Sequence, residues 1–130
     1  MGDTNTGTIR GRCSQHYAID PHGIDAVLLG ALDKSLIDAV IKQNMNTIRY
    51  CYQRELRAHP TLAGKIVVKF VIATDGTVSS DFPAKIKSST MASEAVENCI
   101  TGRFMRFQFP KPAGGGIVIV SYPFIFAPAE

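Results

Sequence analysis

The side chains best suited to chemistry in this sequence are three cysteines and three histidines. Cys13, His16 and His22 follow one another as Cys-x2-His-x5-His, a spacing that offers three ligands to a metal ion. A structural zinc site uses four protein ligands, and this segment contains no fourth cysteine or histidine. We therefore interpret it as a loop with a stray thiol and expect no metal site.

Thiol catalysis at Cys51 or Cys13 is a second chemistry to consider. A cysteine nucleophile needs a base within hydrogen-bond reach. His59 follows Cys51 by eight positions, at the end of an expected helix, so we do not expect the two side chains to meet. Glu94 and Glu97 are spaced as residues on a helix surface. We expect no catalytic residues and no enzymatic activity.

Cys51 and Cys99 lie in two segments with helical patterns, where a disulfide would join the two helices. Such a bond indicates an oxidising compartment. The alternative is a pair of buried free thiols, since unpaired cysteine is a common core residue. The residues alone leave both readings open. If Cys51 and Cys99 pair, Cys13 has no partner in this chain.

The run Gly114-Gly115-Gly116 does not have the context of a phosphate-binding loop. Such a loop follows a strand and begins a helix, whereas this run follows Pro-Lys-Pro and precedes a strand. We interpret it as a hinge and expect no cofactor.

A nucleic-acid-binding face is the main competing class of function. The formal net charge of +3 is too small to imply nucleic acid by itself. Stacking on bases needs exposed aromatic side chains, and we expect Phe104, Phe107 and Phe109 in the core. Most of the basic residues should be solvated surface. These residues are Lys65, Lys69, Lys85, Lys87, Arg103, Arg106 and Lys111.

The chain has 130 residues, a length typical of one domain. Its content of 45% apolar and 19% charged residues is typical of a globular domain. No apolar run approaches the ~20 residues of a membrane-spanning helix. We expect residues 1–31 to be a flexible linker with short strands near 8–12 and 16–19. Residues 32–127 should form the folded domain. The first residues carry no secretory signal, so we expect an excised part of a longer protein.

The hydrophobic periodicity predicts an α+β fold, a small antiparallel sheet with two helices packed on one face. A helix is expected over 33–57, with Asp33 or Ser35 as its cap. Strands are expected at 65–73, from 77 with an interruption at 81–84, at 85–88, and at 117–126. The second helix should run from Ser89 or Thr90 to Phe104.

The last strand is our candidate for partner binding, because an unpaired strand edge is a template for a further strand. The alternative is an interior strand bonded on both sides. Pro123 cannot donate to a ladder, so pairing should favour the residues before it. Tyr122 and Lys69 should then provide side-chain selectivity. The partner-binding residues are predicted to be Ile117, Val118, Ile119, Val120, Ser121 and Tyr122.

Five motifs appear in a fixed order along the chain. They are Ile-Arg-Tyr-Cys-Tyr-Gln-Arg-Glu-Leu at 48–56, Gly-Lys-Ile-Val-Val-Lys-Phe at 64–70, Asp-Gly-Thr-Val at 75–78, Val-Glu-Asn-Cys at 96–99 and Phe-Pro-Lys-Pro-Ala-Gly-Gly-Gly-Ile-Val at 109–118. Over 32–126 the chain resembles the C-terminal periplasmic domain of AgmX/PglI-type (GltJ-like) gliding-motility proteins of myxobacteria. That domain is in turn similar to the C-terminal domain of TonB. The chain departs from such domains in having Phe107 where tryptophan is usual, and in the apparent insertion at 81–84.

The resemblance implies a TonB-like fold and makes a Cys51–Cys99 disulfide structural. It implies a periplasmic module of an inner-membrane-anchored protein, which couples a motor to outer-membrane or periplasmic proteins of the motility complex through an extended peptide. Peptidoglycan is a further partner to consider, and nucleic acid is not expected. A TonB-type energy transducer for outer-membrane transport is the nearest alternative.

Overall fold

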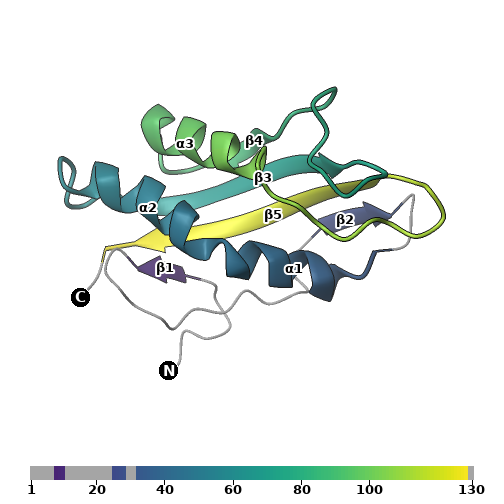
Figure 1. Ribbon diagram of the computed structural model, residues 1–130. Coiled ribbons are helices and arrows are strands. Elements are labelled where there is room, and N and C mark those ends of the chain that lie inside the picture. The colour runs from purple at the N-terminus through teal and green to yellow at the C-terminus, as the bar shows by residue number, and fades with distance from the viewer. Residues whose placement is uncertain (1–7, 11–24, 29–31, 129–130) are drawn as a thin grey trace.

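The computed structural model describes residues 8–10, 25–28 and 32–128. In it, three helical segments lie on one face of a five-stranded sheet (Figure 1). The strands follow the order β1-β5-β3-β4, and β2 also pairs with β5. The elements in chain order are β1 (Thr8–Arg10), β2 (Asp25–Leu28), α1 (Lys34–Gln43), α2 (Met45–Leu56), β3 (Gly64–Ile72), β4 (Lys85–Ser89), α3 (Glu94–Phe104) and β5 (Val118–Ala127).

The central pair of strands is β3 and β5, which run antiparallel in register from Gly64 opposite Phe126 to Ile72 opposite Val118. Successive side chains of a strand point to opposite faces of a sheet, and one face of this pair is fully apolar. The helices α1, α2 and α3 cover that face (Figure 1). Its buried side chains are Ile66, Val68, Phe70 and Ile72 from β3 and Val118, Val120, Tyr122, Phe124 and Phe126 from β5. The α+β prediction, with helices on one face of an antiparallel sheet, is confirmed for β3, β4 and β5. β1 differs, because it pairs with β5 in parallel.

The expected single helix over 33–57 is two helices. Asn44 ends α1, and its side-chain amide donates to the carbonyl of Val40 at 2.8 Å. Side chains of this type compete with the helical hydrogen bonds of the backbone, which accounts for the break. The predicted cap at Asp33 is confirmed, because its carboxylate accepts from the amide of Ser35.

The second helix begins later than the sequence indicates. Thr90 donates its backbone amide to Lys65 at 2.9 Å, and its hydroxyl accepts from the amide of Lys65 at 2.8 Å. Thr90 therefore extends the β3–β4 pairing and cannot begin α3. Ser93 caps the helix instead, accepting from the amide of Val96.

The predicted turn after β3 is confirmed at Asp75-Gly76, where Val78 bridges to Ile72. The interruption before β4 is also as expected, and β4 begins at Lys85. Gly76 has a φ of +88°, a conformation that favours glycine.

The segment 1–31 contributes two strands to the sheet. β1 lies within the expected strand at 8–12, whereas β2 was not expected. The expected strand at 16–19 lies outside the described residues, as do Cys13, His16 and His22. The division of the chain at residue 31 stays a prediction. None of the described helices has the length and apolar character to cross a bilayer.

Candidate functional site

Cys51 of α2 and Cys99 of α3 form a disulfide, with their Cα atoms 5.7 Å apart. Cys51 is fully buried and Cys99 is half-buried. The pairing therefore occurs as the resemblance implied, and it leaves Cys51 without a free thiol for nucleophilic chemistry. Among the described residues, no three histidine, cysteine or acidic side chains gather as metal ligands would.

The predicted partner-binding residues divide into two sets, because β5 alternates between the two faces of the sheet. Val118, Val120 and Tyr122 are fully buried beneath the helices. Ile119 is half-buried on the opposite face, as is Ile117, which directly precedes β5. A partner strand at this edge would therefore meet the β5 backbone and the second set of side chains.

The expectation of an unpaired edge is wrong for most of this stretch. β2 pairs with it antiparallel, from Asp25 opposite Ser121 to Leu28 opposite Val118. β3 pairs with the same residues from the other side, so this part of β5 is an interior strand of the sheet. The signal that could have revealed β2 is the short run Asp-Ala-Val-Leu at 25–28, which follows the turn sequence Asp-Pro-His-Gly. Whether these β5 residues bind a partner stays a prediction.

Tyr122 does not face a partner, contrary to the role expected for it. Its ring is fully buried, and its hydroxyl donates to Oδ1 of Asp38 in α1 at 2.5 Å. Lys42 completes the group with its Nζ atom 2.8 Å from Oδ2 of Asp38. The tyrosine thus fixes the first helix to the sheet and contributes no side-chain selectivity at the surface.

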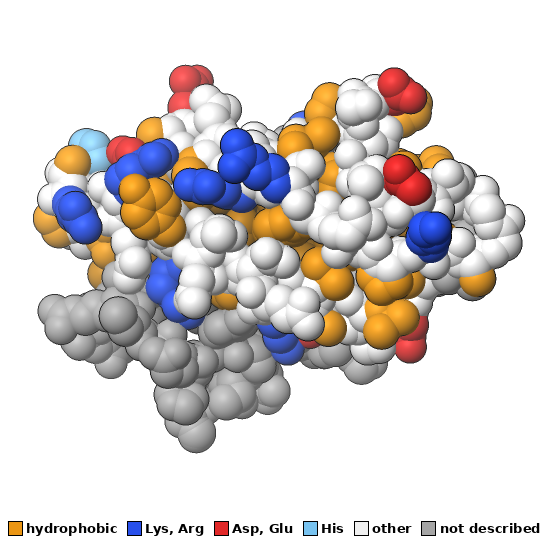
Figure 2. Space-filling view, in the orientation of Figure 1, with side chains coloured by type: hydrophobic (Ala, Val, Ile, Leu, Met, Phe, Trp, Pro, Cys, Tyr) orange, Lys and Arg blue, Asp and Glu red, His pale blue; other side chains and the backbone are white. Residues whose placement is uncertain are grey.

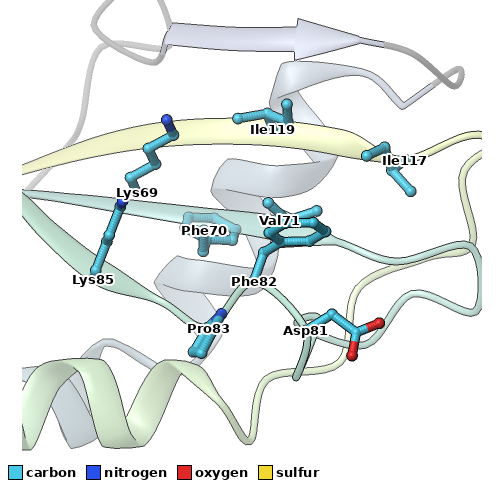
Figure 3. A pocket seen from close by; sticks show the side chains of 9 residues that line it. All are labelled: Lys69, Phe70, Val71, Asp81, Phe82, Pro83, Lys85, Ile117 and Ile119. Carbon is cyan, nitrogen blue, oxygen red and sulfur yellow. The ribbon is translucent and has the colours of Figure 1, made fainter.

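Lys69, the other residue expected to give selectivity, lies on the face of the sheet opposite the helices. It borders a hollow of about 340 Å³ (Figure 3). This volume lies at the small end of the ~300–1,000 Å³ typical of ligand sites. The residues around the hollow are Lys69, Phe70, Val71, Asp81, Phe82, Pro83, Lys85, Ile117 and Ile119.

On the helix side of the molecule, arginine and lysine side chains gather over α2 and α3 (Figure 2). The guanidinium groups of Arg54 and Arg103 lie 5.7 Å and 5.9 Å from the ring centre of Tyr50. Phe104 and Phe109, two of the aromatic side chains considered for base stacking, are buried in the core, as expected. The basic charge here has only Tyr50 as an exposed large aromatic partner among the described residues.

No family model matches the chain, and no curated protein matches it. Two solved structures are similar to it, both of TonB C-terminal domains determined by solution NMR. The Pseudomonas aeruginosa domain is 16% identical with a TM-score of 0.43, over 80% of this chain and 85% of that chain. The Helicobacter pylori domain is 17% identical with a TM-score of 0.42, over 75% of this chain and 92% of that chain.

Proposed function

We propose that this chain is a periplasmic protein-binding module of an envelope-spanning gliding-motility machinery. It couples an inner-membrane motor to outer-membrane or periplasmic partners by taking up an extended partner segment as an additional strand. The role is one of binding and transmission, without catalysis. The five motifs between residues 48 and 118 support this assignment, and the Cys51–Cys99 disulfide supports an oxidising compartment such as the periplasm.

The observation that carries the proposal is the pairing between β2 and the outer edge of β5, which is the side of β5 that faces away from β3. Only four residues, Asp25–Leu28, form the strand that pairs with Val118–Ser121. This pairing of the chain's own β2 supports a binding mode in which a short antiparallel strand lies there in the same register. A partner segment of similar length would replace β2 there, with main-chain hydrogen bonds providing affinity and alternate side chains providing selectivity.

The shape of the sheet suits the transmission of force. β5 makes nine residue pairs with β3, from Gly64 to Ile72, so a strand bound at its outer edge is continuous with the centre of the sheet. The disulfide joins α2 to α3 across the layer that covers this sheet. A load applied at β5 would therefore pass into a covalently linked pair of helices.

The test is NMR titration of the oxidised full chain with extended peptides from outer-membrane proteins of the source organism. The expected result is a shift of the Val118–Ser121 amides together with faster hydrogen exchange in Asp25–Leu28, because the partner displaces β2. The control peptide has alternate amides methylated, which removes its ability to complete the ladder. If the unmethylated peptides change neither the Val118–Ser121 shifts nor the hydrogen exchange of Asp25–Leu28, strand addition at this edge is excluded.

A TonB-type transducer for outer-membrane transport would use the same edge, and the set of peptides distinguishes it. Binding of segments from transport receptors, with no binding of segments from motility proteins, would assign the module to transport.

Peptidoglycan is a further candidate partner, which the arginines beside Tyr50 would bind. We place a nucleic-acid role last, since Phe104 and Phe109 are buried.

A further inference from the structure

The face of the sheet opposite the helices carries a second set of side chains, distinct from the outer edge of β5. Val71 of β3 and Ile119 of β5 lie opposite each other on this face. Phe82, from the segment that precedes β4, lies over Val71 (Figure 3), and this residue is 64% exposed. Large exposed aromatic groups beside a hollow are typical anchors of protein interfaces. The apolar end of the hollow is therefore suited to an apolar side chain.

Two lysines form the other end of the hollow. Lys69 of β3 lies directly opposite Lys85 of β4 in the strand register. Like charges at directly opposed positions destabilise a sheet. Among the described residues neither lysine forms an ion pair, and the carboxylate of Asp81 points away from them (Figure 3). The structure thus has concentrated positive charge beside an apolar hollow.

We propose that this hollow docks an extended, anionic segment of a partner protein in which an apolar side chain lies next to a carboxylate. The apolar side chain packs among Val71, Phe82 and Ile119. The carboxylate lies between the amines of Lys69 and Lys85 and neutralises their mutual repulsion. This site recognises side chains on the face of the sheet, so it does not depend on the strand addition proposed for β5.

The test uses the oxidised full chain and the capped dipeptide acetyl-Leu-Asp-amide, with acetyl-Leu-Asn-amide as the uncharged control. We expect the Asp peptide to shift the resonances of Lys69, Phe82 and Lys85 in NMR titrations. Because an exposed ion pair contributes ~0.2–1 kcal/mol, the Asn peptide should bind about 1.4- to 5-fold more weakly per lost ion pair. The variants Lys69→Gln and Lys85→Gln should each weaken the Asp peptide by about the same factor.

Lys65→Gln is the matched control, since Lys65 is on the same face of β3 as Lys69 but does not line the hollow. It should leave the affinity of the Asp peptide unchanged. Phe82→Ser should abolish binding of both peptides without altering the thermal transition, because the ring is largely exposed.

Four results would overturn the proposal. Equal affinity of the two peptides, or an equal effect of Lys65→Gln and Lys69→Gln, would remove the role of the lysine pair. Shifts confined to Val118–Ser121 would place the peptides at the edge of β5 and not in the hollow. Shifts at Phe82 that follow protein concentration without peptide would assign the hollow to a second copy of the chain. Lys69, Phe82 and Lys85 report on the hollow, whereas Asp25–Leu28 report on strand addition at β5. Failure here therefore leaves the test of strand addition intact.

Discussion

The hydroxyl of Tyr122 in β5 donates to Oδ1 of Asp38 in α1 at 2.5 Å, joining residues 84 positions apart. Both side chains are buried, and Lys42 supplies the counter-charge to the same carboxylate. A buried carboxylate without such partners is costly. This contact therefore fixes α1 to the strand whose outer edge is the candidate partner site.

Removing the Tyr122 hydroxyl tests the importance of this contact. Tyr122→Phe leaves Oδ1 of Asp38 without this donor, and hydrogen bonds to charged groups contribute about 1.5–3 kcal/mol. We expect the free energy of unfolding to fall by about 2 kcal/mol, measured by denaturant titration. Tyr50→Phe is the control, because Tyr50 is exposed and its change should stay within about 0.5 kcal/mol. A Tyr122→Phe protein as stable as the Tyr50→Phe protein would show that the contact contributes nothing.

Reduction of the Cys51–Cys99 disulfide should destabilise the chain strongly. The bond closes a loop with a sequence separation of 48, for which the chain-entropy estimate is roughly 4 kcal/mol. We expect the free energy of unfolding to fall by about that amount in the Cys51→Ala, Cys99→Ala double variant, as measured by denaturant titration under oxidising conditions. The wild-type chain with reductant should match the double variant within about 1–2 kcal/mol, the difference being the small cavity left at Cys51. Equal stability of oxidised and reduced wild type would contradict the structural role of the bond.

Much of the fold could be predicted from the sequence because local signals agree with the tertiary structure. The alternation Ile66, Val68, Phe70 identified β3 and its buried face. The turn at Asp75-Gly76 followed from residue type alone. The break at Asn44 was missed because the apolar stripe continues through it. The structure shows the helix end in the backbone of Asn44, with φ −107° and ψ 14°, and in its side-chain bond to Val40.

The candidate site was harder to predict, because it depends on contacts between distant segments. Neither the length nor the composition of Asp25–Leu28 indicates that it pairs with β5. Likewise, the bond from the Tyr122 hydroxyl to Asp38 joins residues 84 positions apart, so no local pattern in the sequence predicts it. The opposition of Lys69 and Lys85 depends on the register between β3 and β4, which includes an irregularity at Val67/Val68.

The turn after β3 gives a prediction of pH dependence. The hydroxyl and the amide of Thr77 donate to Oδ1 of Asp75 at 2.6 Å and 3.0 Å. These bonds hold the pKa of Asp75 below its ordinary value of 3.8, with the side-chain bond as the largest cause. A carboxylate with a lowered folded pKa stabilises the fold above its ordinary pKa, and this contribution is lost as the pH falls through the folded value.

Thr77→Val should therefore raise the pKa of Asp75 toward its ordinary value, as measured by NMR titration of the carboxyl group. The same variant should make stability less dependent on pH below 3.8. Thr101→Val in α3 is the control, because the Thr101 hydroxyl bonds the carbonyl of Asn98 and does not contact the turn. If the pKa of Asp75 is the same in wild type, Thr77→Val and Thr101→Val, the bond from the Thr77 hydroxyl does not determine it.

Gly76 and Gly102 provide a matched pair of glycine substitutions with opposite expected signs. A Cβ atom at Gly76 would lie 2.1 Å from the carbonyl oxygen of Phe109, at a φ of +88°. The Gly76 carbonyl also accepts from the amide of Phe109 at 2.9 Å, so neither backbone can move away without breaking this bond. Phe109 in turn stacks on Phe70 in the core, with ring centres 5.5 Å apart. Gly76→Ala should therefore lower the free energy of unfolding by about 3 kcal/mol, from backbone strain together with overpacking.

Gly102 lies in α3 with no atom within 4 Å of a Cβ placed there. Gly102→Ala should raise the free energy of unfolding by about 0.5–1 kcal/mol, because alanine loses less backbone entropy in a helix. Denaturant titration of the two variants beside wild type measures both effects. Because the two substitutions add the same methyl group, their opposite signs would separate the close contact at the turn from any general effect of replacing glycine. Destabilisation by both would mean that α3 does not have the open surface seen at Gly102, and stability unchanged in Gly76→Ala would mean that the turn and Phe109 are not in contact.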